Sequence, residues 1–249
     1  MKKTSLLMAL LLAACSGGNE STTVDLQVVT APLDTATVTT DLGFQITLSE
    51  ARLTVADVLF TTGENEQSLA SRVWEWIVPS AHAHPGHFGG GEVAGELLGN
   101  FTLDWQDTAQ PLGTATLITG PFTGVDFLLR RSEDGELGDP AFDGHSFYAA
   151  GTAEKDGQSY PFTALVRFAD GTAVIGAYFV AEIDDSSAGT LSLALSLQDS
   201  FEGDTLFDGV DFLALDGDEP TIDIRPGSPE HNRLDRVLQS HDHYQIALD

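Results

Sequence analysis

The chain has very little cysteine, and this excludes two kinds of stabilising site. Cys15 is the only cysteine among 249 residues. The protein therefore forms no disulfide within the chain and no zinc site built on several thiolates. Any metal site must use histidine, aspartate, glutamate, methionine or backbone oxygen.

Basic residues are also scarce. Eleven Lys and Arg residues stand against 38 Asp and Glu residues, which gives a formal net charge of −27. A chain with this charge repels nucleic acid and anionic lipid surfaces. Two interpretations of the acidity remain: it keeps the protein soluble in a salty habitat, or it concentrates cations near the surface.

The apolar run at the N-terminus is short. Leu6 to Leu12 follows Lys2 and Lys3 and is too short to span a bilayer as a permanent helix. The stretch Leu12-Ala13-Ala14-Cys15 resembles a bacterial lipobox, although an ordinary secretory signal with a chance cysteine remains the alternative.

The lipobox resemblance implies a processed and lipidated chain. It implies that residues 1–14 are a signal peptide that is cleaved, that the Cys15 thiol is lipidated and that residues 15–23 form a flexible tether. Ser16 follows the cysteine, and by analogy with Gram-negative sorting this favours an anchor in the outer membrane, facing the periplasm or the cell surface.

Common catalytic motifs are missing as well. The sequence has no Gly-x-Ser-x-Gly, no Gly-x-x-x-x-Gly-Lys-Ser/Thr and no His-Glu-x-x-His. No nucleophile–base pair and no paired carboxylates stand out. We therefore expect a binding protein and not an enzyme.

Alternating apolar residues predict an all-β domain over residues 24–249, as a sandwich or barrel. Of these we expect an antiparallel β-sandwich of the immunoglobulin or jelly-roll type with one or two short helices. Asp156-Gly157 and Asp170-Gly171 predict hairpin turns in a meander. The expected strands include residues 24–30, 35–48, 51–61, 92–105, 114–119, 125–130, 145–153, 159–168, 173–183, 190–197, 206–213 and 244–248.

Two segments have helical features instead. In residues 63–78, Leu69, Val73, Trp76 and Ile77 recur at helical spacing, and Pro79 ends the pattern. Near the C-terminus, Ser228-Pro229 predicts an N-cap followed by proline in the first helical turn.

Histidines gather in the loop of residues 80–91. His82 and His84 share one face if the chain is extended, and Pro85-Gly86 can turn His87 back toward them. Three neutral imidazoles make a site for copper or zinc, and copper ranks above zinc at nitrogen sites. The alternative is an exposed polar loop that happens to contain histidine.

A second His-x-His pair, His241 and His243, lies near the C-terminus and would join the metal site if the tail packs near the loop. We expect His145 and His231 to have no such role, with His231 exposed in the first turn of the C-terminal helix. The acidic stretches 133–143 and 216–219 supply calcium-type ligands but lack EF-hand spacing, so solvated turns are expected.

The run Gly43-Phe44-Gln45-Ile46-Thr47-Leu48-Ser49-Glu50-Ala51-Arg52-Leu53, which leads into Val55 to Phe60, and the histidine-rich loop that follows resemble the MbnP-like family of periplasmic copper-binding proteins associated with methanobactin operons. The resemblance covers about a third of the chain. It implies an all-β extracytoplasmic fold and copper bound by the loop histidines.

The sequence thus predicts an extracytoplasmic lipoprotein that binds copper, or else zinc, through His82, His84 and His87, for capture or delivery of the metal to a membrane transporter. The rival hypothesis is a structural or adhesive surface lipoprotein that binds a protein or glycan partner and has no metal role.

Overall fold

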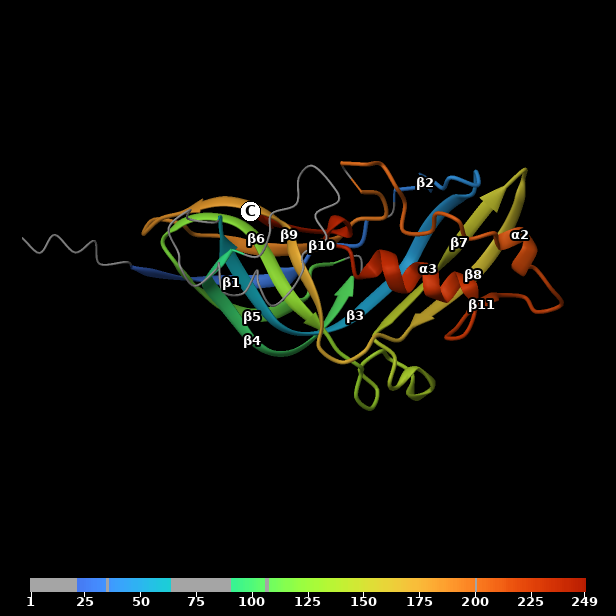
Figure 1. The fold of residues 1–249 in the computed structure, drawn as a ribbon, viewed down its shortest axis with the longest axis horizontal. Helices are drawn as coiled ribbons and strands as arrows, with labels where there is room; N and C mark the ends of the chain where they lie inside the picture. The colour runs from blue at the N-terminus through green and yellow to red at the C-terminus, as the bar shows by residue number, and fades with distance from the viewer. Residues whose placement is uncertain (1–21, 35, 64–90, 106–107, 200) are drawn as a thin grey trace, which may run out of the picture.

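The computed structural model describes residues 22–34, 36–63, 91–105, 108–199 and 201–249. These residues form twelve strands in one connected sheet, so the prediction of an all-β fold is confirmed (Figure 1). Several predicted features lie outside the described residues: the predicted signal peptide of residues 1–14, Cys15, most of the helical pattern of 63–78 and the three histidines of the loop.

The strands follow the chain in this order: β1 (Thr23–Thr30), β2 (Val38–Thr39), β3 (Gln45–Thr62), β4 (Glu92–Trp105), β5 (Pro111–Ile118), β6 (Gly120–Leu129), β7 (Phe147–Lys155), β8 (Gln158–Val166), β9 (Thr172–Ile183), β10 (Thr190–Leu195), β11 (Ile222–Ile224) and β12 (Tyr244–Leu248).

Eight strands form a closed circuit. Starting from β3, each strand pairs with the next in the order β4, β5, β1, β10, β12, β9 and β6, and β6 pairs again with β3. The remaining strands extend from the first half of β3, where β7, β8 and β11 lie side by side and β2 adds to the other edge. Figure 1 shows β3 running from the closed part into this extension.

The expected antiparallel sandwich is corrected in two respects. The strands belong to one sheet and not to two, and three of the pairs are parallel: β1 with β10, β8 with β11 and β9 with β12. Each parallel pair joins strands that are far apart in the sequence, where no hairpin imposes an antiparallel direction.

The predicted meander is confirmed at its first turn and is wrong at its second. Asp156 and Gly157 both have positive φ, at 53° and 77°, and join β7 to β8 as a tight hairpin. The second Asp-Gly turn, at residues 170–171, does not join paired strands, because β9 pairs with β6 and β12 and not with β8. The chain crosses at this turn from the extension into the closed circuit.

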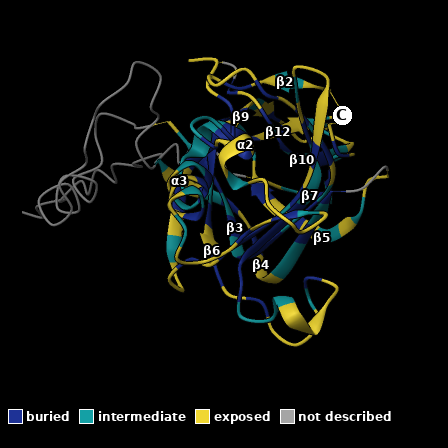
Figure 2. Cartoon of the chain, turned by 90° about the vertical axis from the view of Figure 1, so that its right-hand side faces the viewer, coloured by how far each residue is buried: buried dark blue, intermediate teal, exposed yellow. Residues whose placement is uncertain are grey.

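The core follows from the alternation of apolar side chains along the strands (Figure 2). Residues 191, 193, 195 and 197 are all buried leucines, as the spacing predicts. Two fully buried aromatic residues have partners for their polar atoms: Trp105 Nε1 donates to the carbonyl of Leu193 at 2.9 Å, and the Tyr244 hydroxyl donates to the carbonyl of Leu238 at 2.8 Å.

β4 is bulged where it pairs with the second half of β3. The register of β3 against β4 shifts between Ala56 and Val58, where Asp57 alone stands opposite Leu98 and Gly99, so the extra residue belongs to β4. Asp57 has a φ of 48°. Its carboxylate accepts a hydrogen bond from the backbone N–H of Gly99 at 2.9 Å. A second shift lies between Phe60 and Thr61, opposite the β4 segment that contains Gly95.

One edge of β3 pairs with two different strands in succession, and we call the point of change at Thr54 the fork. Up to Leu53 this edge pairs with β7, and from Val55 it pairs with β6. At the division, Thr54 N donates to the Ser146 carbonyl at 2.8 Å, and Thr54 Oγ1 donates to the Arg130 carbonyl at 2.8 Å. Thr54 is fully buried, so these bonds satisfy polar groups that water does not reach.

Arg130 closes the fork from the other side. Its guanidinium donates to the carbonyls of Val55 and Phe101, at 3.0 and 3.3 Å. It also donates to both carboxylate oxygens of Glu136, at 2.6 and 2.7 Å. Only 8% of Arg130 is exposed. The bidentate pair ties the loop between β6 and β7 to the end of the closed circuit.

The helices are short. They are η1 (Pro140–Phe142), α2 (Phe212–Leu215), α3 (Pro229–Leu238) and η2 (His241–His243). The predicted N-cap of α3 is confirmed, because Ser228 Oγ accepts from His231 N at 3.0 Å. The strand expected at 206–213 is wrong: this stretch forms turns that lead into α2, and its Phe207 and Phe212 rings pack on Phe162.

The Glu136–Arg130 pair makes stability depend on pH. The hydrogen bond from Arg130 holds the pKa of Glu136 below its usual range. This contribution to stability is therefore complete above the unfolded pKa of about 4.3 and is lost as the pH falls through the lower pKa of the folded state. We expect Glu136→Gln to lower the urea midpoint at neutral pH, and the gap to the unmodified protein to close in acid.

The matched control is Glu133→Gln, in the same loop. Its side chain is outside the pair with Arg130, so it should leave the dependence of the midpoint on pH close to that of the unmodified protein. A gap between the Glu136→Gln and unmodified proteins that stays constant from neutral pH to about pH 3 would contradict the assignment.

Candidate functional site

Of the predicted metal ligands, the structure describes only His241 and His243. Both lie in η2, between α3 and β12. The loop histidines His82, His84 and His87 are outside the described residues, so the idea that the tail pair joins them stays a prediction. Within the described parts of the chain, no three His, Cys, Asp or Glu side chains come together as a metal site.

The two tail histidines have different surroundings. His243 is only 3% exposed, and its Nδ1 lies 3.0 Å from the Ser196 carbonyl. Because a carbonyl only accepts, Nδ1 carries the proton, and Nε2 holds the lone pair when the ring is neutral. His241 is directed instead to Asp242, with Nε2 3.0 Å from Oδ1.

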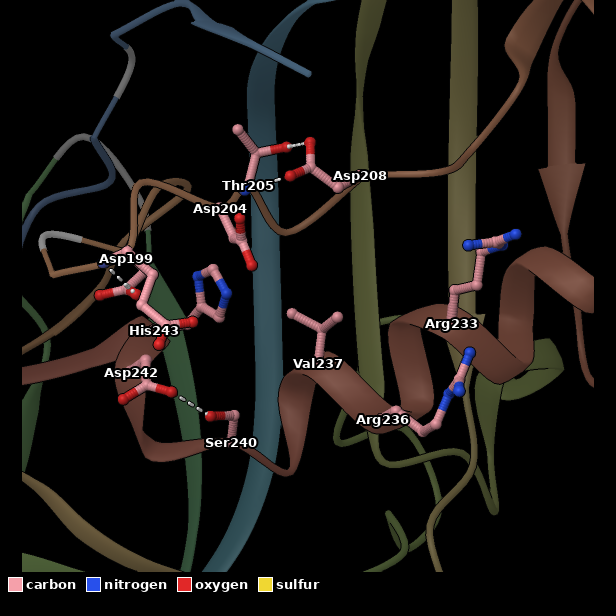
Figure 3. A pocket seen from close by; sticks show the side chains of 11 residues that line it. Asp199, Asp204, Thr205, Asp208, Arg233, Arg236, Val237, Ser240, Asp242 and His243 are labelled. Atoms are coloured by element: carbon pink, nitrogen blue, oxygen red, sulfur yellow. Dashed lines mark hydrogen bonds between the residues drawn. The ribbon is translucent and has the colours of Figure 1, made fainter. Parts of the chain in front are cut away.

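His243 lines a pocket of about 600 Å³. The loop between β10 and α2 forms one side, and α3 with η2 forms the other (Figure 3). A volume of this size lies in the range of small-molecule sites. Figure 3 shows the imidazole on the side of Asp204 and Asp242, with Val237 between it and the two arginines of α3.

Five carboxylates line the pocket: Asp199, Glu202, Asp204, Asp208 and Asp242. Three of them also accept hydrogen bonds from residues close in the sequence and so stabilise the segments around the pocket. Asp199 accepts from the N–H groups of Phe201 and Glu202, both at 2.8 Å. Asp208 and Asp242 likewise accept hydrogen bonds from residues close in the sequence.

The Asp208 carboxylate accepts from the backbone N–H and the hydroxyl of Thr205, at 3.0 and 2.6 Å. Asp242 accepts from the Ser240 hydroxyl. Asp204 differs from these because it is exposed and its carboxylate accepts no hydrogen bond from another described residue. The carboxylate of Asp204 is therefore available to a cation from solution.

Arg233 and Arg236 give the pocket its positive side. They lie one turn apart on α3, and both are exposed. Neither forms a salt bridge with a carboxylate of the described residues. Arg233 lies close over Gly209, where a Cβ atom would come within 2.2 Å of Nη1, so a residue without a side chain permits this approach.

The expectation that His231 is exposed is wrong. Only 6% of its surface is accessible, because α3 packs on β8 and the ring faces that strand's end. Nε2 accepts a hydrogen bond from the Arg167 backbone N–H at 3.3 Å. His145 is buried as well, with Nδ1 3.0 Å from the Phe142 carbonyl, and its burial lowers its pKa.

The acidic stretch of residues 133–143 is a structured loop. Besides the pair of Glu136 with Arg130, Asp143 accepts from Gly135 N and Asp139 caps η1 by accepting from Ala141 N, both at 2.8 Å. These carboxylates are thus engaged by donors of the protein itself, in keeping with the expectation of turns.

Sequence reasoning missed the pocket. It identified α3 and the His-x-His pair, but it gave no reason to place the loop of residues 199–208 opposite them. The contact arises because β10 pairs with β12, which brings the residues that follow β10 next to those that precede β12. No local pattern records this pairing.

No family model, no curated protein and no solved structure matches this chain. In the described residues, no helix is both long enough and apolar enough to cross a membrane.

The bond from His243 to Ser196 makes a prediction about stability. His243→Ala removes a buried donor and leaves the Ser196 carbonyl without it, so we expect a loss of about 1–3 kcal/mol in the free energy of unfolding by urea. His243→Asn places an amide nitrogen near the position of Nδ1 and should retain most of this energy. Equal losses in both variants would show that the bond to Ser196 contributes nothing.

Proposed function

We propose that this protein is an extracytoplasmic lipoprotein, anchored through Cys15, that binds copper, or else zinc, through His82, His84 and His87. Its role is to capture the metal or deliver it to a membrane transporter. The resemblance to the MbnP-like family and the bunching of three histidines support the choice of metal. The closed β-scaffold supports the choice of a binding protein.

The observation that carries the proposal is the stem from which the histidine loop leaves the sheet. β3 and β4 pair as an antiparallel hairpin up to Thr62 and Glu92, which are directly opposite each other. A hairpin needs only about 2–5 residues to connect its strands. Residues 64–90 are therefore an excursion that closing the sheet does not require, and long excursions of this kind commonly carry function.

Two glycines, Gly63 and Gly91, flank the last residue pair of the stem. Gly63 lies against the Thr123 side chain of β6, where a Cβ atom would come within 3.3 Å of Cγ2. A Cβ on Gly91 would come within 1.6 Å of the Thr62 carbonyl oxygen. The two glycines let the backbone at the end of the stem approach its neighbours closely.

Metal binding through imidazoles requires their neutral form. Affinity should therefore fall as the pH drops below about 6.5, the ordinary pKa of histidine. The net charge of −27 favours the approach of cations at every pH above this.

The test is elemental analysis of the full chain, purified in detergent without an affinity tag that contains histidine. We expect about one equivalent of copper or zinc, lost when His82, His84 and His87 are all replaced by alanine. Replacing residues 64–90 with a short glycine-containing turn should remove the metal equally while the urea midpoint stays close to that of the unmodified protein.

A second pair of variants tests the tail. If His241 and His243 join the site, His241→Ala and His243→Asn each weaken metal affinity; if they do not, only the loop variants do. Retention of the metal by the triple-alanine variant would reject the loop as the site.

One feature favours the rival, a surface lipoprotein that binds a protein or glycan. Ile175, Tyr178 and Val180 are exposed on the outer side of β9, and the ring of Phe201 lies 6.0 Å from that of Tyr178. Exposed apolar groups that lie close together often mark interaction sites. A protein that carries no metal and binds neither added copper nor added zinc at neutral pH would favour this function.

A further inference from the structure

The pocket beside η2 has a negatively charged end and a positively charged end. Its binding properties can be inferred independently of the loop histidines. Its volume of about 600 Å³ is sufficient for a molecule of the size of an amino acid or a short peptide. Charged side chains of opposite sign line it on either side of Val237 (Figure 3).

The negative end contains Asp204, Asp242 and the imidazole of His243. Asp204 has an exposed carboxylate without a hydrogen-bond donor among the described residues. His243 is 97% removed from solvent, and the Ser196 carbonyl holds its Nδ1. The other ring nitrogen, Nε2, has no hydrogen-bond partner in the described chain and is the polar atom that this side chain offers to the pocket.

The positive end consists of Arg233 and Arg236, whose guanidinium groups have no carboxylate partner in the described structure. The protein has 38 acidic and 11 basic residues, so the sequence is rich in possible partners for these two arginines. Two of the acids around the pocket, Asp199 and Asp208, are held by backbone N–H groups and do not reach the arginines.

The fold keeps the two ends apart. Arg233 and Arg236 extend from α3, whose helical axis fixes their separation from the residues of η2 that follow it. Asp204 belongs to the opposite loop, which the backbone bond from Asp199 N to the Asp204 carbonyl closes at 2.8 Å. A ligand in this space meets carboxylates at one end and guanidinium groups at the other, with an aliphatic side chain between them.

We propose that the pocket binds a small amphoteric molecule, with its ammonium group toward Asp204, Asp242 and His243 Nε2 and its carboxylate toward Arg233 and Arg236. Arginine pairs well with carboxylates, because its N–H groups match the two oxygens. A short aliphatic chain between the two charges of the ligand would lie along Val237. Free amino acids and short peptides belong to this chemical class.

The probe is 6-aminohexanoate, which has one ammonium and one carboxylate group on a flexible chain. Hexylamine and hexanoate are its matched controls, since each lacks one of the charges. Calorimetric titration of the full chain in detergent, at neutral pH and with a chelator present, should show saturable binding of 6-aminohexanoate in the millimolar range. Each control compound should bind about tenfold more weakly or not at all.

Variants assign the two ends. Arg233→Gln and Arg236→Gln should each weaken the binding of 6-aminohexanoate several-fold and leave the weak binding of hexylamine unchanged. Asp204→Asn should weaken the binding of 6-aminohexanoate and abolish that of hexylamine. The matched control is Arg225→Gln, which removes an exposed arginine that pairs with Asp223 on β11, and it should leave the affinity unchanged.

Three outcomes would overturn the proposal. They are the absence of saturable binding of 6-aminohexanoate, equal affinity for hexylamine and 6-aminohexanoate, and an equal loss of affinity in Arg225→Gln and in the two pocket variants. The first outcome would mean that the pocket holds only solvent. The second would mean that it binds cations alone, and the third would mean that the arginines act only through the net charge of the protein. Because the chelator is present throughout, none of these outcomes bears on metal binding by the loop.

Discussion

The fold depends on the fork at Thr54, where one strand must serve two partners on the same edge. β3 pairs first with β7 and then with β6. A gap between two strands would leave buried backbone groups without partners, and each would cost about 1–3 kcal/mol. Thr54 and Arg130 supply the missing bonds: the hydroxyl reaches the Arg130 carbonyl, and the guanidinium reaches the carbonyls of Val55 and Phe101. The closed circuit and its extension can therefore share β3 without leaving buried backbone groups at the fork unpaired.

The extension then determines where the C-terminal segment lies. β7, β8 and β11 continue the sheet beyond the fork, and α3 packs on β8 through the buried His231. From the end of α3 the chain returns to the closed circuit, where β12 enters between β10 and β9. η2 is the short connection between these two parts. This is why His243 and the arginines of α3 face the loop that follows β10, and why the pocket lies at the junction of extension and circuit.

Local features of the sequence were sufficient for elements that depend only on neighbouring residues. The bounds of β4, the Asp156-Gly157 hairpin and the Ser228 cap of α3 follow from alternation, turn chemistry and capping. Pairing between distant strands was beyond such reasoning. Asp170-Gly171 has the same residue types as Asp156-Gly157, yet β9 leaves β8 and joins β6. The burial of His231 and the pocket depend on these distant pairings, so the sequence could indicate their residues but not bring them together.

The acidity of the chain has a structural component that composition does not reveal. The two explanations of the acidity, solubility and the attraction of cations, both assume that the carboxylates act as surface charges. Many of them instead accept hydrogen bonds from backbone N–H groups at turns, bulges and helix starts, among them Asp57, Asp126, Asp139, Asp143, Asp170, Asp184, Asp199, Asp208 and Asp211. A protein without disulfides, with many strands and many turns, needs such acceptors, because each one satisfies a donor that the sheet does not reach. Aspartates occupied in this way are less available to pair with arginine, so basic side chains in this protein can remain unpaired beside several acids. Among the described residues, Arg233 and Arg236 have no carboxylate partner, in keeping with this use of aspartate in the turns around them.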